Sequence, residues 1–225
     1  MAPLPKLPGL GGWSEDPLWG SFYDWTVEHQ RLGGALWALG IQSDLRLLYD
    51  AAAEIGRQRS GARVLDVPCG GGVALRGLRP DQGLDYVAAD ISQLMLDRTA
   101  RAARERGVAD QVTTRLADVE ELPFEDQSFD LVVSFTGLHC FPDPARAVVE
   151  LARVTKLGGV ITGSALLNDT GMRFEPMRRA GRLAGLLGPG CTSEEVQRWL
   201  ARQGVADVSL DVSGAMGYFR GVRRA

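Results

Sequence analysis

A short apolar segment that ends in an acid and a run of glycines constrains this chain more than any other feature. Residues 62–72 read Ala-Arg-Val-Leu-Asp-Val-Pro-Cys-Gly-Gly-Gly, so an apolar strand pattern reaches Asp66 and then Gly70–Gly72. Glycine has no Cβ, and a turn built from it allows a ligand to lie directly against the backbone. The segment predicts a strand followed by a turn that binds a nucleoside-type cofactor.

The size and charge of the chain favour one soluble catalytic unit. Its 225 residues are 45% hydrophobic and 24% charged, with a formal net charge of -3. A chain of this length suits one α/β domain with an accessory segment. The mild acidity gives no basic face for nucleic acid, so we expect a small-molecule partner and a monomer or homodimer.

The cysteines indicate a reducing compartment. Cys69, Cys140 and Cys191 are odd in number, far apart and without C-x-x-C spacing, which disfavours disulfides and a zinc site. No acidic or histidine cluster has the spacing of a metal site. The first dozen residues lack the apolar core of a signal peptide, and no run approaches the ~18 apolar residues of a membrane span. We therefore expect a cytoplasmic protein without a membrane span or a metal.

The chain divides into three parts by pattern. Residues 1–12 are rich in proline and glycine and predict a flexible tail. Residues 13–60 predict an N-terminal helical cap, in which Leu45, Leu48, Ala52 and Ile55 recur at helix spacing. Residues 61–225 predict the main domain, with 168–190 as a lid-like insertion.

Apolar runs and amphipathic helices then alternate, as in β-α-β units. The expected strands are Arg63–Val67, Tyr86–Asp90, Val112–Ala117, Leu131–Phe135, Val160–Ala165, Val205–Val212 and Met216–Val222. The expected helices are Val73–Leu78, Gln93–Arg106, Ala145–Thr155 and one from Thr192, whose capping box includes Glu195, to about Gln203. We expect 156–159 to end the third helix. The pattern predicts a Rossmann-like, doubly wound, mostly parallel seven-stranded sheet with an antiparallel C-terminal strand.

Residues that follow the predicted strands should meet, because open parallel sheets bind ligands at the carboxyl ends of their strands. Asp90 offers two oxygens to a pair of ribose hydroxyls, and Asp118 can accept a hydrogen bond from an adenine amine. Val119, Ile91 and Met95 could form an apolar slot for the flat ring. The four junctions after strands one to four together suit one adenosine that carries an amino-acid tail.

A dinucleotide site is the poorer interpretation. The motif G-x-G-x-x-G or G-x-G-x-x-A, counted from Gly70, places Leu75 at its third small position, and counted from position 68 it begins with a proline. The nicotinamide-dependent dehydrogenase therefore remains only a less favoured alternative.

Five motifs in order carry a family resemblance. They are Val64–Gly72, Ala89–Leu96, Leu122-Pro123-Phe124, Ser128–Val132 and Leu138–Asp143. Over roughly residues 60–167 the chain resembles the class I S-adenosylmethionine-dependent methyltransferases, in particular the ubiquinone/menaquinone-type small-molecule enzymes. Several motifs in the correct order are more specific than one glycine loop. The cofactor implied is S-adenosyl-L-methionine, with S-adenosyl-L-homocysteine as product.

The resemblance also implies residue roles. Asp66 and Gly70 would hold the amino group, Asp90 the ribose, Asp118 and Val119 the adenine, and Phe135 and Leu138 the sulfonium side. Pro68 stands where the family usually has glycine, which removes one amide donor from the turn, while Gly70 and Gly72 remain.

His139 and Tyr23 are the further candidates. His139 lies beside the expected methyl donor and is a candidate general base, although a packed structural histidine is the commoner case. Tyr23, in the aromatic-rich part of the cap, is the candidate there for contact with cofactor or substrate. Cys69 and Cys140 are expected to behave as small buried hydrophobes.

The sequence thus predicts methyl transfer to a small apolar or aromatic molecule. The acceptor atom, whether O, N, C or S, stays undetermined. The alternative from another class is a non-catalytic module that binds the cofactor in order to sense or assemble.

Overall fold

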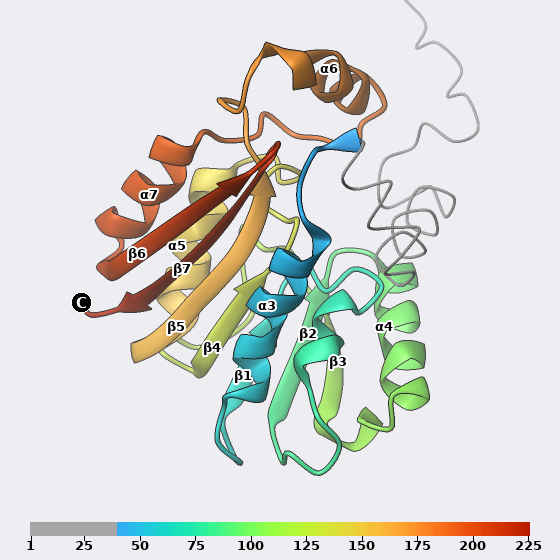
Figure 1. Ribbon diagram of the computed structural model, residues 1–225. Helices are drawn as coiled ribbons and strands as arrows, with labels where there is room; N and C mark the ends of the chain where they lie inside the picture. Colours follow the sequence, from blue (N-terminus) through green and yellow to red (C-terminus); the bar gives the residue numbers. More distant parts are fainter. Residues whose placement is uncertain (1–39) are drawn as a thin grey trace, which may run out of the picture.

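The computed structural model describes residues 40–225, which form a seven-stranded sheet with helices on both faces (Figure 1). The strands lie in the order β3-β2-β1-β4-β5-β7-β6, and β7 runs antiparallel to both of its neighbours. Their bounds are β1 Arg63–Asp66, β2 Asp85–Asp90, β3 Val112–Leu116, β4 Phe129–Ser134, β5 Thr155–Leu166, β6 Val205–Ser213 and β7 Met216–Arg223. The predicted doubly wound, mostly parallel sheet is confirmed.

Alternate residues along the central strands enter two separate cores. The helical elements are α3 Leu45–Gly56, η1 Val73–Gly77, α4 Gln93–Glu105, η2 Ala109–Gln111, α5 Pro144–Val154, η3 Met172–Phe174, α6 Glu175–Leu183 and α7 Ser193–Arg202. Val64 packs with α3, η1 and α4, whereas its neighbour Leu65 packs with α5 and α7 on the opposite face. Because both faces of a central strand are buried, its sequence is apolar over consecutive residues, as in β1, β2 and β4.

Helix α3 is the described part of the predicted cap. The side chain of Asp44 caps it by accepting a hydrogen bond from the Arg46 amide, and Leu45, Leu48, Ala52 and Ile55 are buried as their spacing predicts. Residues 13–39 of the expected cap, which include Tyr23, and the expected tail of residues 1–12 lie outside the described residues.

The helix expected near Val73–Leu78 is present as the short 3-10 helix η1, and its Gly77 lies so close to α3 that an added Cβ would stand 1.9 Å from the Ala52 carbonyl oxygen. One local prediction was wrong. Residues 156–159 do not end a helix. They belong to β5, which begins at Thr155 opposite Phe129 and takes an irregularity in register before Val160.

Gly158, in that irregular stretch, has a φ of 79°. Both a helix C-terminus and a strand irregularity favour such a glycine, so local sequence does not distinguish them.

Within residues 40–225, no helix combines the length and the apolar character that crossing a bilayer requires.

Candidate active site

One cavity of about 650 Å³ opens at the carboxyl ends of the parallel strands. Its wall comes from the segments after β1, β2, β3 and β4, the end of β5, the start of β7 and helix α6. The volume is in the range of small-molecule sites, about 300–1,000 Å³. Of the predicted site residues, the cavity wall includes Pro68, Gly70, Asp90, Ile91, Met95, Asp118, Val119, Phe135 and His139.

Gly70 and Gly72 of the turn after β1 have different structural roles. Gly70 lines the cavity with a φ of 51°, and nothing lies within 4 Å of where its Cβ would stand. Gly72 is absent from the wall, and its Cβ would stand 3.3 Å from the Cα of Thr99 in α4. Gly70 therefore leaves room for a ligand on the backbone, while Gly72 allows the turn to pack closely against α4.

Asp90 closes the same turn from the end of β2. One carboxylate oxygen accepts from the Gly70 amide at 3.0 Å, and the other accepts from the Ser92 amide at 2.9 Å. Burial raises the pKa of Asp90 above its ordinary value, while those amide hydrogen bonds act in the opposite direction. Each oxygen keeps further acceptor capacity, so the carboxylate suits a vicinal diol.

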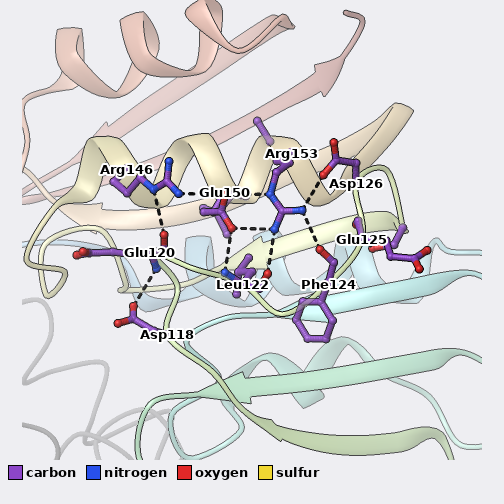
Figure 2. A network of polar contacts seen from close by, with 12 residues as sticks. Asp118, Glu120, Leu122, Phe124, Glu125, Asp126, Arg146, Glu150 and Arg153 are labelled. Carbon is purple, nitrogen blue, oxygen red and sulfur yellow. Dashed lines mark hydrogen bonds and ion pairs between the residues drawn. The ribbon is translucent and has the colours of Figure 1, made fainter.

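Asp118 and Val119 lie on the loop after β3, which hydrogen bonds and the ion pair of Arg153 with Asp126 tie to helix α5 (Figure 2). The exposed Asp118 accepts from the Glu120 amide at 2.9 Å, and Val119 is 7% exposed. Arg153 donates to the carbonyl oxygens of Leu122 at 2.9 Å and Phe124 at 2.8 Å.

The partner of Arg153 in this network is Glu150, which is 4% exposed. Its carboxylate accepts from Nε and Nη2 of Arg153 at 2.9 and 2.8 Å, and from the Leu122 amide at 2.9 Å. The hydrogen bond from Arg153 holds the pKa of Glu150 below its ordinary value. We call Glu150 and Arg153 the α5 clamp, because together they hold the loop that carries Asp118 and Val119.

Asp66 and Leu138 do not reach the cavity wall. Asp66 is 1% exposed and accepts a hydrogen bond from the Tyr86 hydroxyl at 2.7 Å, and burial raises its pKa to about 7. Leu138 is fully buried in the core on the α5 face. The structure therefore places both behind the wall, Asp66 below the glycine turn and Leu138 below the segment after β4.

The segment after β4 crosses the middle of the cavity. Phe135 and Thr136 line it, and Thr136 takes a φ of 53° while its amide donates to the Ser164 hydroxyl at 3.1 Å. A β-branched residue in this region of φ is strained, and such strain concentrates at functional sites. Thr136 carries no motif that would have identified it in the sequence.

His139, at the same segment, has an unusual hydrogen bond. Its Nδ1 accepts from the Leu166 amide at 2.9 Å, and burial lowers its pKa to about 4. A neutral ring whose Nδ1 accepts must carry its proton on Nε2. This arrangement disfavours the general-base role that the sequence suggested.

Comparison with known proteins identifies the type of domain. A family model described as a methyltransferase domain matches residues 65–162. The chain is 37% identical to a demethylmenaquinone methyltransferase of Renibacterium salmoninarum over 133 residues, 59% of this chain and 50% of that protein. It is 33% identical to the 27-O-demethylrifamycin SV methyltransferase of Amycolatopsis mediterranei over 112 residues, 50% of this chain and 41% of that protein.

Residues 65–162 therefore form a methyltransferase domain, similar to those of the class I S-adenosylmethionine-dependent methyltransferases. The matched part spans half or less of the length of these two curated relatives. The predicted cofactor, S-adenosylmethionine, is the one that this family uses.

Solved structures share this fold. A protein from Bordetella parapertussis described as a possible exported protein aligns at a TM-score of 0.74 and 18% identity, covering 92% of this chain and 79% of that one. Phosphoethanolamine N-methyltransferase 2 of Haemonchus contortus, solved with S-adenosyl-L-methionine, aligns at 0.70 and 17%, covering 92% and 57%.

The residues present fit S-adenosylmethionine. Gly70 leaves a cradle that a Cβ would fill, and the buried Asp90 carboxylate lies next to it on the same wall. We call this part of the methyltransferase cavity, with Asp118 and Val119, the cofactor half.

The other end of the methyltransferase cavity is almost wholly apolar. Its described wall, the acceptor half, consists of Ile41, Leu166, Met177, Ala180, Gly181, Ala184, Leu186, Leu187 and Met216. The sequence did not identify Leu166 or Met216 as site residues. The ends of β5 and β7 meet here through tertiary pairing, Leu166 opposite Met216, which no local motif signals.

Proposed function

We propose that this methyltransferase transfers the methyl group of S-adenosylmethionine to a small, largely apolar or aromatic molecule. The observation that carries the proposal is one continuous cavity, which runs from a polar cofactor half at the tips of β1–β3 into an apolar half under α6. The sheet order supports this division, since β2 and β3 lie on one side of β1 and β4, and β5 and β7 lie on the other.

The proposed roles in the cofactor half follow from the contacts there. Asp90 holds the ribose hydroxyls, Gly70 allows the amino-acid tail to lie on the backbone, and Asp118 accepts from the adenine amine beside the apolar Val119. Asp66 is buried below the glycine turn, so its proposed role is to support the turn and not to contact the cofactor directly.

When bound, S-adenosylmethionine supplies an electrophilic methyl group on a sulfonium, which a nucleophile attacks in line. The chain has to align the acceptor and exclude water, effects that together can lower a barrier by up to about 7–11 kcal/mol. Helix α6 supports this role, because Met177, Ala180 and Ala184 from its region cover the apolar half. We accordingly propose that residues 168–190 act as a lid.

Binding and turnover test the proposal separately. Isothermal titration of the full chain should show S-adenosylmethionine binding and no NAD binding, and incubation with radiolabelled S-adenosylmethionine and a panel of apolar and aromatic metabolites should yield a methylated product. NAD binding without S-adenosylmethionine binding would overturn the proposal. Cofactor binding without turnover on any acceptor would favour the non-catalytic module.

A further inference from the structure

We propose that His139 is a hydrogen-bond donor that orients the methyl acceptor, and that it selects apolar molecules presenting an oxygen lone pair. This inference rests on the proposed function, since it concerns the acceptor half of the same cavity. His139 lines the cavity on the segment after β4, between the cofactor half and the apolar wall under α6.

The backbone determines which ring nitrogen carries the proton. The Leu166 amide lies 2.9 Å from Nδ1, and an amide N–H can only donate. Nδ1 must therefore offer its lone pair, which leaves the single proton of the neutral ring on Nε2. Leu166 is the last residue of β5 and pairs with Met216 of β7, so the sheet itself holds this donor in place.

A base at this position would need a lone pair facing the acceptor. The lone pair of Nδ1 is taken by Leu166, and Nε2 bears a hydrogen. Burial lowers the pKa of the ring to about 4, so the neutral form persists at neutral pH. What His139 offers the cavity is one N–H donor, whose Nε2 has no partner among residues 40–225.

The other polar groups near His139 are already engaged. The Thr136 hydroxyl donates to the Phe135 carbonyl oxygen at 2.7 Å, and the Cys140 thiol contacts the Thr136 carbonyl oxygen at 3.5 Å. The carboxylates of the described wall, Asp90 and Asp118, follow β2 and β3 on the other side of β1.

These surroundings define the acceptor by its chemistry. An ammonium group would meet an N–H donor and an apolar wall, without a carboxylate from the described part of this half. A carbonyl, ether or hydroxyl oxygen would instead satisfy the Nε2–H, for which residues 40–225 provide no acceptor. The class is thus an apolar, uncharged molecule with an oxygen beside the atom that receives the methyl group.

The tautomer can be observed directly. Long-range ¹H–¹⁵N spectra of the ¹⁵N-labelled full chain distinguish the two neutral tautomers and the imidazolium, and the variant His29→Gln identifies the signals of the other histidine. We expect the Nε2-protonated form from about pH 6 to about pH 8, with and without S-adenosylhomocysteine. A ring protonated on Nδ1, or an imidazolium at neutral pH, would overturn the inference.

A matched pair of probes tests the selection. 1-Acetylnaphthalene and 1-ethylnaphthalene share an apolar frame, but only the ketone accepts a hydrogen bond. In the presence of S-adenosylhomocysteine, fluorescence titration should show about tenfold tighter binding of the ketone, a change typical of one hydrogen bond. Equal affinity of the two probes for the wild-type chain would contradict the proposal.

Two substitutions separate donation from structural support. His139→Asn places an oxygen near Nδ1 for the Leu166 amide but has no donor at the Nε2 position, so the preference for the ketone should disappear. His139→Gln places an amide N–H near Nε2 and should retain part of the preference. An unaltered preference in His139→Asn would overturn the inference.

The failure of the proposed function is distinguishable from the failure of this inference. S-adenosylhomocysteine binding by isothermal titration should be the same in the wild type and in both variants. If the wild type does not bind it, the proposed function fails, whereas the spectra still report the state of the His139 ring.

Discussion

The cofactor half and the acceptor half of the cavity differ in how their walls are held. The cofactor half consists of strand tips and loops bound by charged hydrogen bonds, with Asp90 on the Gly70 turn and the α5 clamp on the loop of Asp118. The acceptor half lies under α6, the helix at the top of Figure 1, and is apolar along nearly all of its described wall.

The attachment of α6 shows the contrast most clearly. The buried residue of this helix is Arg178, which is 2% exposed and donates to the carbonyl oxygens of Leu167 at 2.9 Å and Gly171 at 3.0 Å. At its far end the Gly188 amide donates to the His139 carbonyl oxygen at 2.9 Å. Met177 and Leu187 also pack against the core, so apolar packing and a few hydrogen bonds hold this segment, whereas charged groups hold the cofactor half.

The largest expected effect is on the α5 clamp. Arg153→Met removes the hydrogen-bonded cation of the buried Glu150 and leaves only Arg146, 3.8 Å away, so the free energy of unfolding should fall by about 3 kcal/mol, as for a broken buried pair. Urea denaturation measures this. Arg198→Met is the control, because its partner Glu194 is 84% exposed and the loss should stay below about 1 kcal/mol. Equal losses in the two variants would mean that the clamp is an ordinary surface pair.

Asp66 should make stability fall as pH rises. Its folded pKa of about 7 exceeds the ordinary value of 3.8, so between those values the folded state binds more protons than the unfolded state. The wild type should lose about 2 kcal/mol from this group between pH 5 and pH 8. Asp66→Asn, which still accepts from the Tyr86 hydroxyl, should lack this loss when urea denaturation is compared at the two pH values.

The same pH dependence of stability in Asp66→Asn as in the wild type would contradict this prediction. Asp97→Asn serves as the control for a general effect of removing one charge, because Asp97 is exposed on α4.

A substitution of Asp90 tests the cofactor half through the affinity for S-adenosylmethionine. Asp90→Ala should weaken S-adenosylmethionine affinity by roughly 1.5–3 kcal/mol, since charge-assisted hydrogen bonds to the ribose are lost. Isothermal titration measures the change, and circular dichroism checks that the fold is intact. The affinity for 1-ethylnaphthalene, which belongs to the apolar half, should not change. An unaltered dissociation constant for S-adenosylmethionine would count against the assigned role.

The smallest effect is expected in the acceptor half. Ala180→Leu adds volume to the wall on α6 and should weaken 1-ethylnaphthalene binding by about 1 kcal/mol, without altering S-adenosylmethionine affinity. Leu183→Ala on the same helix is the control, because Leu183 is 88% exposed and outside the wall. Fluorescence titration measures the affinity for 1-ethylnaphthalene. A parallel loss of cofactor affinity in Ala180→Leu would show that the two halves of the cavity are not independent.

Local sequence was sufficient for most of the cofactor half. A strand, an acid and glycines are neighbours in the chain, and parallel strands bring their carboxyl ends to one edge, so the sequence alone predicts that Gly70, Asp90 and Asp118 lie together. The sequence did not predict the direction in which two side chains of this region point. Asp66 and Leu138 lie one step from the wall in sequence but behind it in space, because Tyr86 and the core on the α5 face hold them.

Local sequence patterns thus determined the sheet, its doubly wound topology and the cofactor half, since periodicity and turn chemistry act between residues that are near in sequence. Tertiary structure alone decided the acceptor half and the state of His139. The ends of β5 and β7 meet α6 only after the sheet forms, and the Leu166 amide that assigns the ring proton is 27 residues away in sequence. A hydrogen bond over that separation depends on the complete fold, and no motif encodes it.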